Sequence, residues 1–431
     1  MSFPGAVLMG AQGQLLDPTI PYRYFAAAQV FHVVMWALIA GFPSDMAVFA
    51  GGSGPPLAAL HGLTLGVLTT TAMGASLQML PVATGTPLRS ARVARIASWF
   101  FIPGTAVLIW GMVSGEHLAM AAGGVGVSLG LGMVVVLVGD VLWRARAFEP
   151  VPLFGLTALA FLLAALALGL ALIVDEGHGL LDQRGRIAAV HVIVAGLGFI
   201  GMLALGFSHV LVPLFALTQG VPVGEARAVF ALCGLGLAAG IVGVGYDLPV
   251  AASAGTLLGL AGAALHLRGM RRCLTTGMRT NLGVSGVLMH VGWGFMVAAL
   301  ILGLATAADL VEMDGPRMFV FLALFGWLLT FLLGVLQRIL PFLGAMNATG
   351  AGTKPPRPSE LAPESWLRAH AALHLLALTL VGIGIATEMA LPIRIGGIAG
   401  LLGAAIYAGF ALRVWWLIHG PGRTPIDKER P

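Results

Sequence analysis

Long apolar stretches alternate with short polar segments along almost the whole chain. A helix needs about 20 consecutive, mostly apolar residues to cross the hydrocarbon core of a bilayer. Twelve stretches of this kind predict helices near residues 22–42, 57–83, 93–113, 119–143, 152–174, 188–218, 225–245, 249–267, 282–307, 317–346, 365–387 and 390–418. We therefore expect an all-α polytopic membrane protein with about twelve transmembrane helices, and we treat residues 1–431 as a single transmembrane domain.

Composition supports a lipid environment. Hydrophobic residues make up 58% of the chain and charged residues only 10%, whereas a soluble domain carries about 25% charged residues. A surface so poor in charge cannot face water, so the expected partner is the lipid bilayer. The net charge of +5 does not by itself indicate nucleic-acid binding, because basic loops facing one leaflet are typical of membrane proteins.

The basic residues are distributed unequally between the two sides of the predicted bundle. One set of loops, with the C-terminal tail, holds sixteen of them: Arg89, Arg92, Arg95, Arg144, Arg146, Arg227, Arg268, Arg271, Arg272, Arg279, Lys354, Arg357, Arg368, Arg423, Lys428 and Arg430. The opposite loops hold four: Arg184, Arg186, Arg317 and Arg394. Lys and Arg concentrate on the cytoplasmic side of membrane proteins. We therefore expect a bacterial-type inner (plasma) membrane protein with both termini in the cytoplasm.

The predicted helices also repeat at an interval of about 130 residues. Within the second helix of each unit, Gly66, Gly196 and Gly326 keep this interval. These three helices also end alike, each with a polar side chain about one turn before a proline: Gln78 and Pro81, His209 and Pro213, Gln337 and Pro341. The pattern predicts three four-helix repeats around an axis normal to the membrane, over 22–151, 152–281 and 282–418, with 419–431 as a tail. The alternative is a chance alignment of glycine-rich helices.

Histidines within the apolar stretches are the main candidates for chemistry. His61 and His191 both lie five residues before a repeat glycine, about 6 Å below the outer interface by the rise of a helix. Others lie on the spans at His32, His209, His290, His370 and His374. Ionisable side chains at membrane depth are costly, and they indicate a functional site. Together the histidines favour a cofactor or metal, although any one of them could be an ordinary hydrogen-bonding residue.

Heme b is the cofactor that this pattern suits best. Imidazole binds iron, copper and zinc, and heme iron takes axial His ligands. Apart from Glu225 at the first position of one stretch, the spans contain a single acid, Asp140, which argues against a hard-cation site. Arg184, Arg186 and Arg317 are placed to hold heme propionates at the outer side. The alternative is that these arginines pair with nearby acids, namely Asp175, Glu176, Asp182 and Asp314.

The layout resembles the catalytic subunit of heme–copper oxidases and nitric oxide reductases. The segment from His61-Gly-Leu-Thr-Leu-Gly66 to Thr86-Pro-Leu-Arg89 is also similar to the NnrS family, which is associated with heme, copper and nitric oxide stress. The resemblance implies that His61 matches an axial ligand of the low-spin heme, and that His191 lies on the helix supplying one copper ligand. The ligand set is degenerate, however, because residues 226–246 and 317–346 contain no histidine. The usual oxygen-reducing center therefore cannot be assembled.

Three functional interpretations remain open. The first is a heme-binding membrane protein, with copper as a further metal, that acts in electron transfer or in handling nitric oxide or another small gas with a redox partner protein. In it, His61 and His191 bind the heme, with Arg184, Arg186 and Arg317 beside them. This first interpretation includes an oxidoreductase that lacks the usual oxygen-reducing heme–copper center. The metal-ligand candidates are His32, His209, His290, His370 and His374. The other interpretations are a transporter for a metal or small solute, and a non-catalytic assembly subunit.

The charge asymmetry gives a testable topology. Reporter fusions after Arg92 and Arg272 should give cytoplasmic activity, and a fusion after Asp182 should give periplasmic activity, because basic loops stay in the cytoplasm. Paired phosphatase and fluorescent-protein reporters at each site provide the measurement. A cytoplasmic signal after Asp182 would contradict the orientation.

Overall fold

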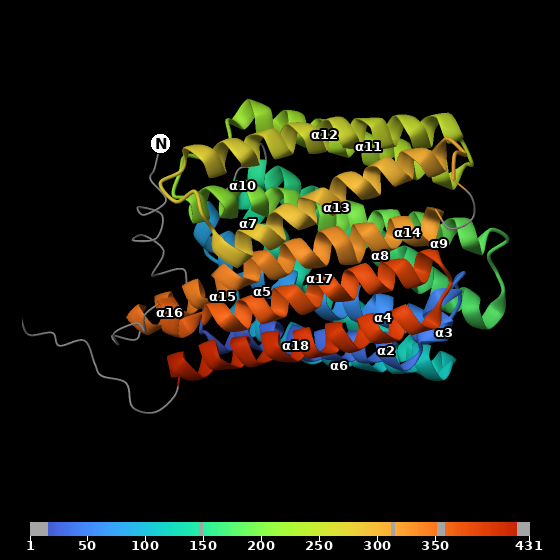
Figure 1. Cartoon of the computed structure of the whole chain (residues 1–431), viewed down its shortest axis with the longest axis horizontal. Coiled ribbons are helices and arrows are strands. Elements are labelled where there is room, and N and C mark those ends of the chain that lie inside the picture. Colours follow the sequence, from blue (N-terminus) through green and yellow to red (C-terminus); the bar gives the residue numbers. More distant parts are fainter. Residues whose placement is uncertain (1–15, 146–149, 312–314, 351–357, 420–431) are drawn as a thin grey trace, which may run out of the picture.

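A computed structural model of the chain describes residues 16–145, 150–311, 315–350 and 358–419. Within these ranges every regular element is helical, and the long helices run side by side (Figure 1). The elements of the first third are α2 (Thr19–Gly41), α3 (Pro43–Ala47), α4 (Pro55–His61), π-helix η2 (Gly62–Thr69), α5 (Thr70–Thr84), α6 (Ala91–Ser114) and α7 (His117–Arg144). Those of the middle third are α8 (Pro150–His178), α9 (Arg184–Val192), π-helix η3 (Ile193–Gly201), α10 (Met202–Ala216), α11 (Val223–Gly245) and α12 (Pro249–Thr276). Those of the last third are α13 (Gly283–Ala307), α14 (Gly315–Phe321), π-helix η4 (Leu322–Leu329), α15 (Thr330–Gly350), α16 (Pro358–Leu361), α17 (Glu364–Ala386) and α18 (Ala390–His419).

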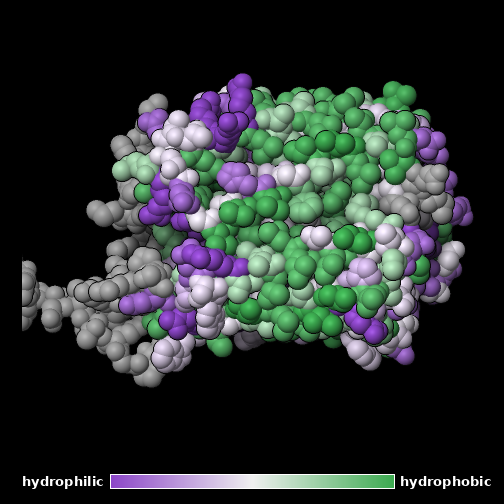
Figure 2. All heavy atoms as spheres, viewed as in Figure 1, coloured by the Kyte–Doolittle hydropathy of each residue, from purple (hydrophilic) through white to green (hydrophobic). Residues whose placement is uncertain are grey.

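Twelve helical spans in the described residues are long and apolar enough to cross a membrane. Three of them are composite helices, in which α4, η2 and α5, then α9, η3 and α10, then α14, η4 and α15 continue one another. Apolar residues form a broad middle band, and polar residues gather toward the two ends (Figure 2). The expected all-α polytopic membrane protein with twelve spans is confirmed. The predicted tail 419–431 falls, apart from its first residue, outside the described residues.

Most helix ends lie within a few residues of the predicted ones, and the main exception is α12. This helix was expected to end at residue 267, but it continues to Thr276 through Arg268, Arg271 and Arg272. The apolar stretch ends where hydrocarbon ends, whereas the backbone hydrogen bonds of a helix continue into the interface. Basic side chains near a helix C-terminus are also stabilised by the helix dipole.

The twelve spans form a closed ring of three four-helix units. In each unit the third and fourth spans pack closely together, as α6 with α7, α11 with α12 and α17 with α18. Neighbouring units meet through α7 and α8, α12 and α13, and α18 and α2, so the last unit contacts the first. At the center, each π-helix contacts the other two. Because the spans are even in number, α2 begins and α18 ends at the same end of the bundle, which we call the terminal end (Figure 1).

One glycine contact recurs in all three units. In each, a side chain on the first span lies where a Cβ on the composite helix would have to fit, at 2.6 to 2.7 Å: Phe31 at Gly66, Phe161 at Gly198 and Phe295 at Gly326. Eight residues further on, the contact repeats at 2.8 to 3.1 Å with Tyr24 at Gly74, Phe154 at Gly206 and Leu288 at Gly334. By contact, therefore, the second-unit counterpart of Gly66 is Gly198. The assignment of Gly196 from the 130-residue interval was wrong by two residues, and Pro81, Pro213 and Pro341 keep the corrected register.

Each π-helix lies in the same part of its composite helix. A π-turn shifts the hydrogen-bond register by one residue and leaves a carbonyl to be satisfied by another group. Thr70 and Thr330 occupy equivalent positions just after their π-helices, and their hydroxyls donate to the carbonyls of Leu65 (2.8 Å) and Phe325 (3.1 Å), five residues back. The second unit has Met202 at this position and therefore lacks the side-chain donor.

The corrected register predicts different costs for two neighbouring substitutions. Gly198→Ala should destabilise the protein by about 1–3 kcal/mol, the usual cost of overpacking, because its Cβ would lie 2.7 Å from the ring of Phe161. Gly196→Ala should cost less, since it meets one flexible methyl of Leu324 at 3.0 Å. Thermal unfolding in detergent gives the measurement, with Gly132→Ala as the control, because nothing lies within 4 Å of a Cβ there. Equal losses for Gly196→Ala and Gly198→Ala would contradict the register.

Candidate cofactor site

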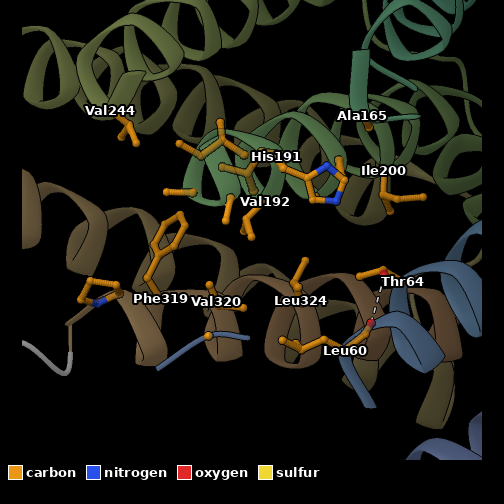
Figure 3. Close-up of a pocket in the computed structure, with 18 of the residues that line it drawn as sticks. Leu60, Thr64, Ala165, His191, Val192, Ile200, Val244, Phe319, Val320 and Leu324 are labelled. Carbon is orange, nitrogen blue, oxygen red and sulfur yellow. Dashed lines mark hydrogen bonds between the residues drawn. The ribbon is translucent and has the colours of Figure 1, made fainter. Parts of the chain in front are cut away.

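A cavity of about 1350 Å³ opens at the end of the bundle opposite the terminal end. We call this the cavity end. The walls come from all three units, chiefly from the composite helices and from α8, α11 and α12. Most of the lining side chains are aliphatic or aromatic, and His191 lies among them, with Leu60 and Thr64 on a facing helix (Figure 3). Such a cavity suits a large, mostly apolar ligand.

His61 and His191 face each other within this cavity. His61 is the last residue of α4, and His191 lies two residues before η3, so both precede the π-helix of their unit. The imidazole centers are 6.5 Å apart, and the ring planes differ by 17°. No hydrogen bond joins the two rings in the described part of the chain. The structure thus brings together the two histidines that the sequence placed near the outer interface.

The hydrogen bond of His61 fixes which nitrogen is available. Its Nδ1 lies 3.0 Å from the carbonyl oxygen of Leu57, one turn earlier. A carbonyl only accepts, so Nδ1 carries the proton and Nε2 keeps a free lone pair. Metal-binding histidines commonly donate their other N–H to a backbone carbonyl in this way. On His191, Nδ1 is buried and has no hydrogen-bond partner. The site therefore contains imidazole nitrogens with no partner in the protein.

The distance between the two rings suits one shared metal ion. An imidazole nitrogen binds a metal such as zinc at about 2.0–2.1 Å, and the ring center lies roughly 1 Å farther out, so rings on opposite sides of one ion have centers about 6–6.5 Å apart. The observed 6.5 Å between His61 and His191 agrees with this value. The separation is therefore compatible with one ion between the two rings, although the Cε1 edge of His191 also lies against Gly169 of α8.

The arginines at the cavity end are held by acidic side chains. Arg184 contacts Asp175 at 2.6 Å and also pairs with Glu176. Arg317 pairs with Glu388 at 2.7 Å and donates to the carbonyl of Ala47 at 2.9 Å. The ion-pair alternative thus holds for Arg184 with the expected acids. For Arg317 the acid found is Glu388, since Asp314 lies outside the described residues.

Arg186 differs from the other two arginines. It pairs with Asp247 at 3.2 Å rather than with Asp182, and it is not among the residues that line the cavity. Arg184 and Arg317 do line it, together with Glu176 and Glu388. Only these two of the three predicted propionate partners are therefore placed beside a ligand in the cavity.

His32, His370 and His374 form a separate buried group between α2 and α17. Each has a hydrogen-bonding neighbour in the protein. Nε2 of His32 accepts from the indole of Trp36 at 3.1 Å, Nε2 of His374 lies 2.9 Å from the hydroxyl of Thr330, and Nδ1 of His370 lies 3.4 Å from the amide nitrogen of Gln337. These contacts form a polar seam between helices, but Nδ1 of His32 and Nε2 of His370 are buried without a partner. The shared metal or heme that the helical spacing predicted stays a prediction. In the described residues, no group of three or more His, Cys, Asp or Glu is arranged to hold a metal ion.

The remaining predicted histidines lie elsewhere, and one relevant histidine was missed. His290 is exposed on α13, with Nδ1 2.7 Å from the carbonyl oxygen of Gly286. His209 packs against His266 of α12, with ring centers 5.2 Å apart. His266 was overlooked although it lies within the predicted stretch 249–267. The signal for including it was its place among the apolar residues of that stretch, like the other histidines on the spans.

The hydrogen bonds of the seam predict the effect of removing one histidine. His374→Ala should lower stability by about 2 kcal/mol, because it removes a buried hydrogen bond to Thr330 and leaves a void. The metal and heme content of the purified protein should stay the same. Thermal unfolding and elemental analysis provide the measurements, and the exposed His290→Ala is the control. Loss of a metal ion from the His374→Ala protein would support the shared site instead.

The chemistry available in the cavity is ligation of one metal between two imidazoles, in an apolar enclosure with two arginines at its mouth. A porphyrin fits this donor set, because its faces are apolar, its iron takes two axial ligands and its propionates need cationic partners.

Comparison with protein-family models and with the curated proteins finds no match to this chain.

Proposed function

We propose that the chain is a heme-binding membrane protein, in which His61 and His191 would hold one heme. The observation that carries the proposal is the 6.5 Å separation of their near-parallel rings inside a cavity of about 1350 Å³. Ligand pockets usually measure about 300–1000 Å³, so a porphyrin has room here. Bound heme iron supplies one-electron redox chemistry.

Two axial histidines favour electron transfer over the binding of a small gas. A heme with both axial positions filled has no open position for nitric oxide or oxygen, whereas a heme with one histidine has. This agrees with the resemblance to the oxidase helix that carries a low-spin heme ligand, and it assigns His191 to the second ligand. The protein would then relay electrons between the heme and a redox partner protein.

The residues around the pair suit the edges and faces of a porphyrin. Gly169 on the wall lets the imidazole of His191 approach the backbone of α8, where a Cβ would lie 3.3 Å from its Cε1. At the mouth, Arg184 and Arg317 carry the positive charge that propionates require. Their present acidic partners show that both side chains reach this region, and heme binding would exchange part of those contacts for propionate.

The basic residues of the loops suggest which way the cavity faces. Most of them belong to the terminal end, whereas Arg184, Arg186, Arg317 and Arg394 belong to the cavity end. By the positive-inside rule the terminal end is cytoplasmic, so the cavity opens on the outer face of a bacterial-type inner membrane. A redox partner would therefore meet the heme edge from that side.

Single histidine substitutions test the ligation. His61→Ala should lower heme affinity by at least about 100-fold, because removing only the hydrogen-bond partner of a metal ligand already lowers metal affinity by about 10–100-fold. His191→Ala should retain part of the heme but change the absorption spectrum from low-spin to high-spin, because the hydrogen-bonded His61 remains as a single ligand. Absorption spectra of protein purified from heme-supplemented cells provide the measurement.

His290→Ala is the matched control, because this histidine is exposed on a neighbouring helix and should leave the spectrum unchanged. Unchanged heme content in both His61→Ala and His191→Ala would show that another site holds the heme. A wild-type protein without heme after supplementation would remove the proposal and leave the transporter and assembly-subunit interpretations.

A further inference from the structure

A second histidine pair lies toward the terminal end of the bundle. His209 on α10 and His266 on α12 have ring centers 5.2 Å apart and planes that differ by 63°. His266 is 1% exposed, and neither of its ring nitrogens has a hydrogen-bond partner. Among the histidines that the structure describes, it is the one with both nitrogens buried and unpartnered. A buried polar group in this condition is expected to bind a water, an ion or a ligand.

The hydrogen bond of His209 favours an ion among these three. Nδ1 of His209 lies 2.8 Å from the carbonyl oxygen of Leu205, so it carries the proton and Nε2 keeps a lone pair. That Nε2 is also buried and without a partner. The two rings lie side by side, yet no hydrogen bond joins them in the described residues. Two neighbouring imidazoles with free nitrogens are a donor set for a metal ion.

The separation of the rings also suits a shared ion. Two imidazoles bound to one ion at a bent angle of about 110–120° have ring centers about 5–5.5 Å apart, by the same bond lengths as before. The observed value is 5.2 Å, against 6.5 Å for His61 and His191. The second pair is thus suited to a compact ion rather than to a porphyrin between opposed ligands.

The surroundings favour a soft ion of low charge. Phe154 stacks on His209 with ring centers 5.4 Å apart, and Trp293 meets His266 edge-on at 6.5 Å. The acid on the adjoining end of α11, Glu225, faces two arginines: its Oε2 pairs with Arg272 at 2.8 Å, and its Oε1 lies 3.7 Å from Nε of Arg268. A dication without carboxylate ligands is costly to bury, and a monovalent ion is less so.

Copper in its monovalent state meets these requirements. It binds imidazole and thioether ligands. Met270 is fully buried and lies four residues after His266, on the same face of α12. We propose that His209 and His266 form a binding site for one Cu(I) ion, separate from the His61–His191 pair. The proposal does not depend on heme binding, because the two pairs share no residue.

Anaerobic titration with Cu(I) against a chromogenic Cu(I) chelator tests the site in the full-length protein. Wild-type protein should compete with the chelator for one equivalent of copper. His209→Leu and His266→Leu, on different helices, should each weaken that binding by at least about 100-fold. Removing only the hydrogen-bond partner of a metal ligand already lowers metal affinity by about 10–100-fold. His290→Leu, at an exposed histidine outside both pairs, should bind copper as the wild type does. Gel filtration and thermal unfolding check that each variant is folded.

Several outcomes would overturn the proposal. These are a wild-type protein that binds no Cu(I), copper binding that survives both His209→Leu and His266→Leu, or copper binding that is lost in His290→Leu. Zn(II) binding at this pair in place of Cu(I) would also overturn it. If the leucine variants fail to fold, X-ray absorption of copper-loaded wild type decides, because imidazole ligands give a multiple-scattering pattern that sulfur-only ligation lacks.

Discussion

The bundle depends on a close contact between glycines of the three composite helices and bulky side chains of the helix that precedes each one. Gly66, Gly198 and Gly326 leave no space for a Cβ, because a phenylalanine side chain already occupies it. In a bilayer, where lipid is as apolar as the helices, such close packing replaces the hydrophobic effect as the force that joins helices. The contact brings the three π-helices together at the center, and it fixes the height at which His61 and His191 enter the cavity.

The departure from exact repetition matters for the cofactor site. In the contact register, His61 lies five residues before Gly66, whereas His191 lies seven residues before Gly198. Two residues turn a side chain by about 200° around a helix. The two histidines are therefore not symmetry equivalents, and their helices present them in different directions relative to the shared axis. A strictly repeated sequence would have pointed equivalent side chains the same way around that axis, whereas the shift allows one ring to face the other.

The sequence predicted the spans well, because the length of an apolar stretch is a local property set by bilayer thickness. It also singled out His61 and His191 from their position near a helix end. It did not reveal the π-helices, the two-residue shift to Gly198 or the facing of the two rings, which depend on packing between distant segments. His266 lies within the predicted stretch 249–267, but its contact with His209 also joins distant segments. The acid paired with Arg317 was likewise a long-range contact that no spacing along the chain indicates.

One continuous helix connects the two histidine pairs. His191 and His209 are 18 residues apart along α9, η3 and α10, which corresponds to about 25 Å along a helix. Between them, Trp327 of η4 packs against Gly201, so the central part of the connection is filled by side chains. Substitutions more than about 10 Å apart usually act additively. Ligands at the two pairs should therefore bind independently, unless the π-helix between them has two arrangements that both ligands bias. In that case the affinity of each ligand would depend on whether the other is bound, and by the same factor.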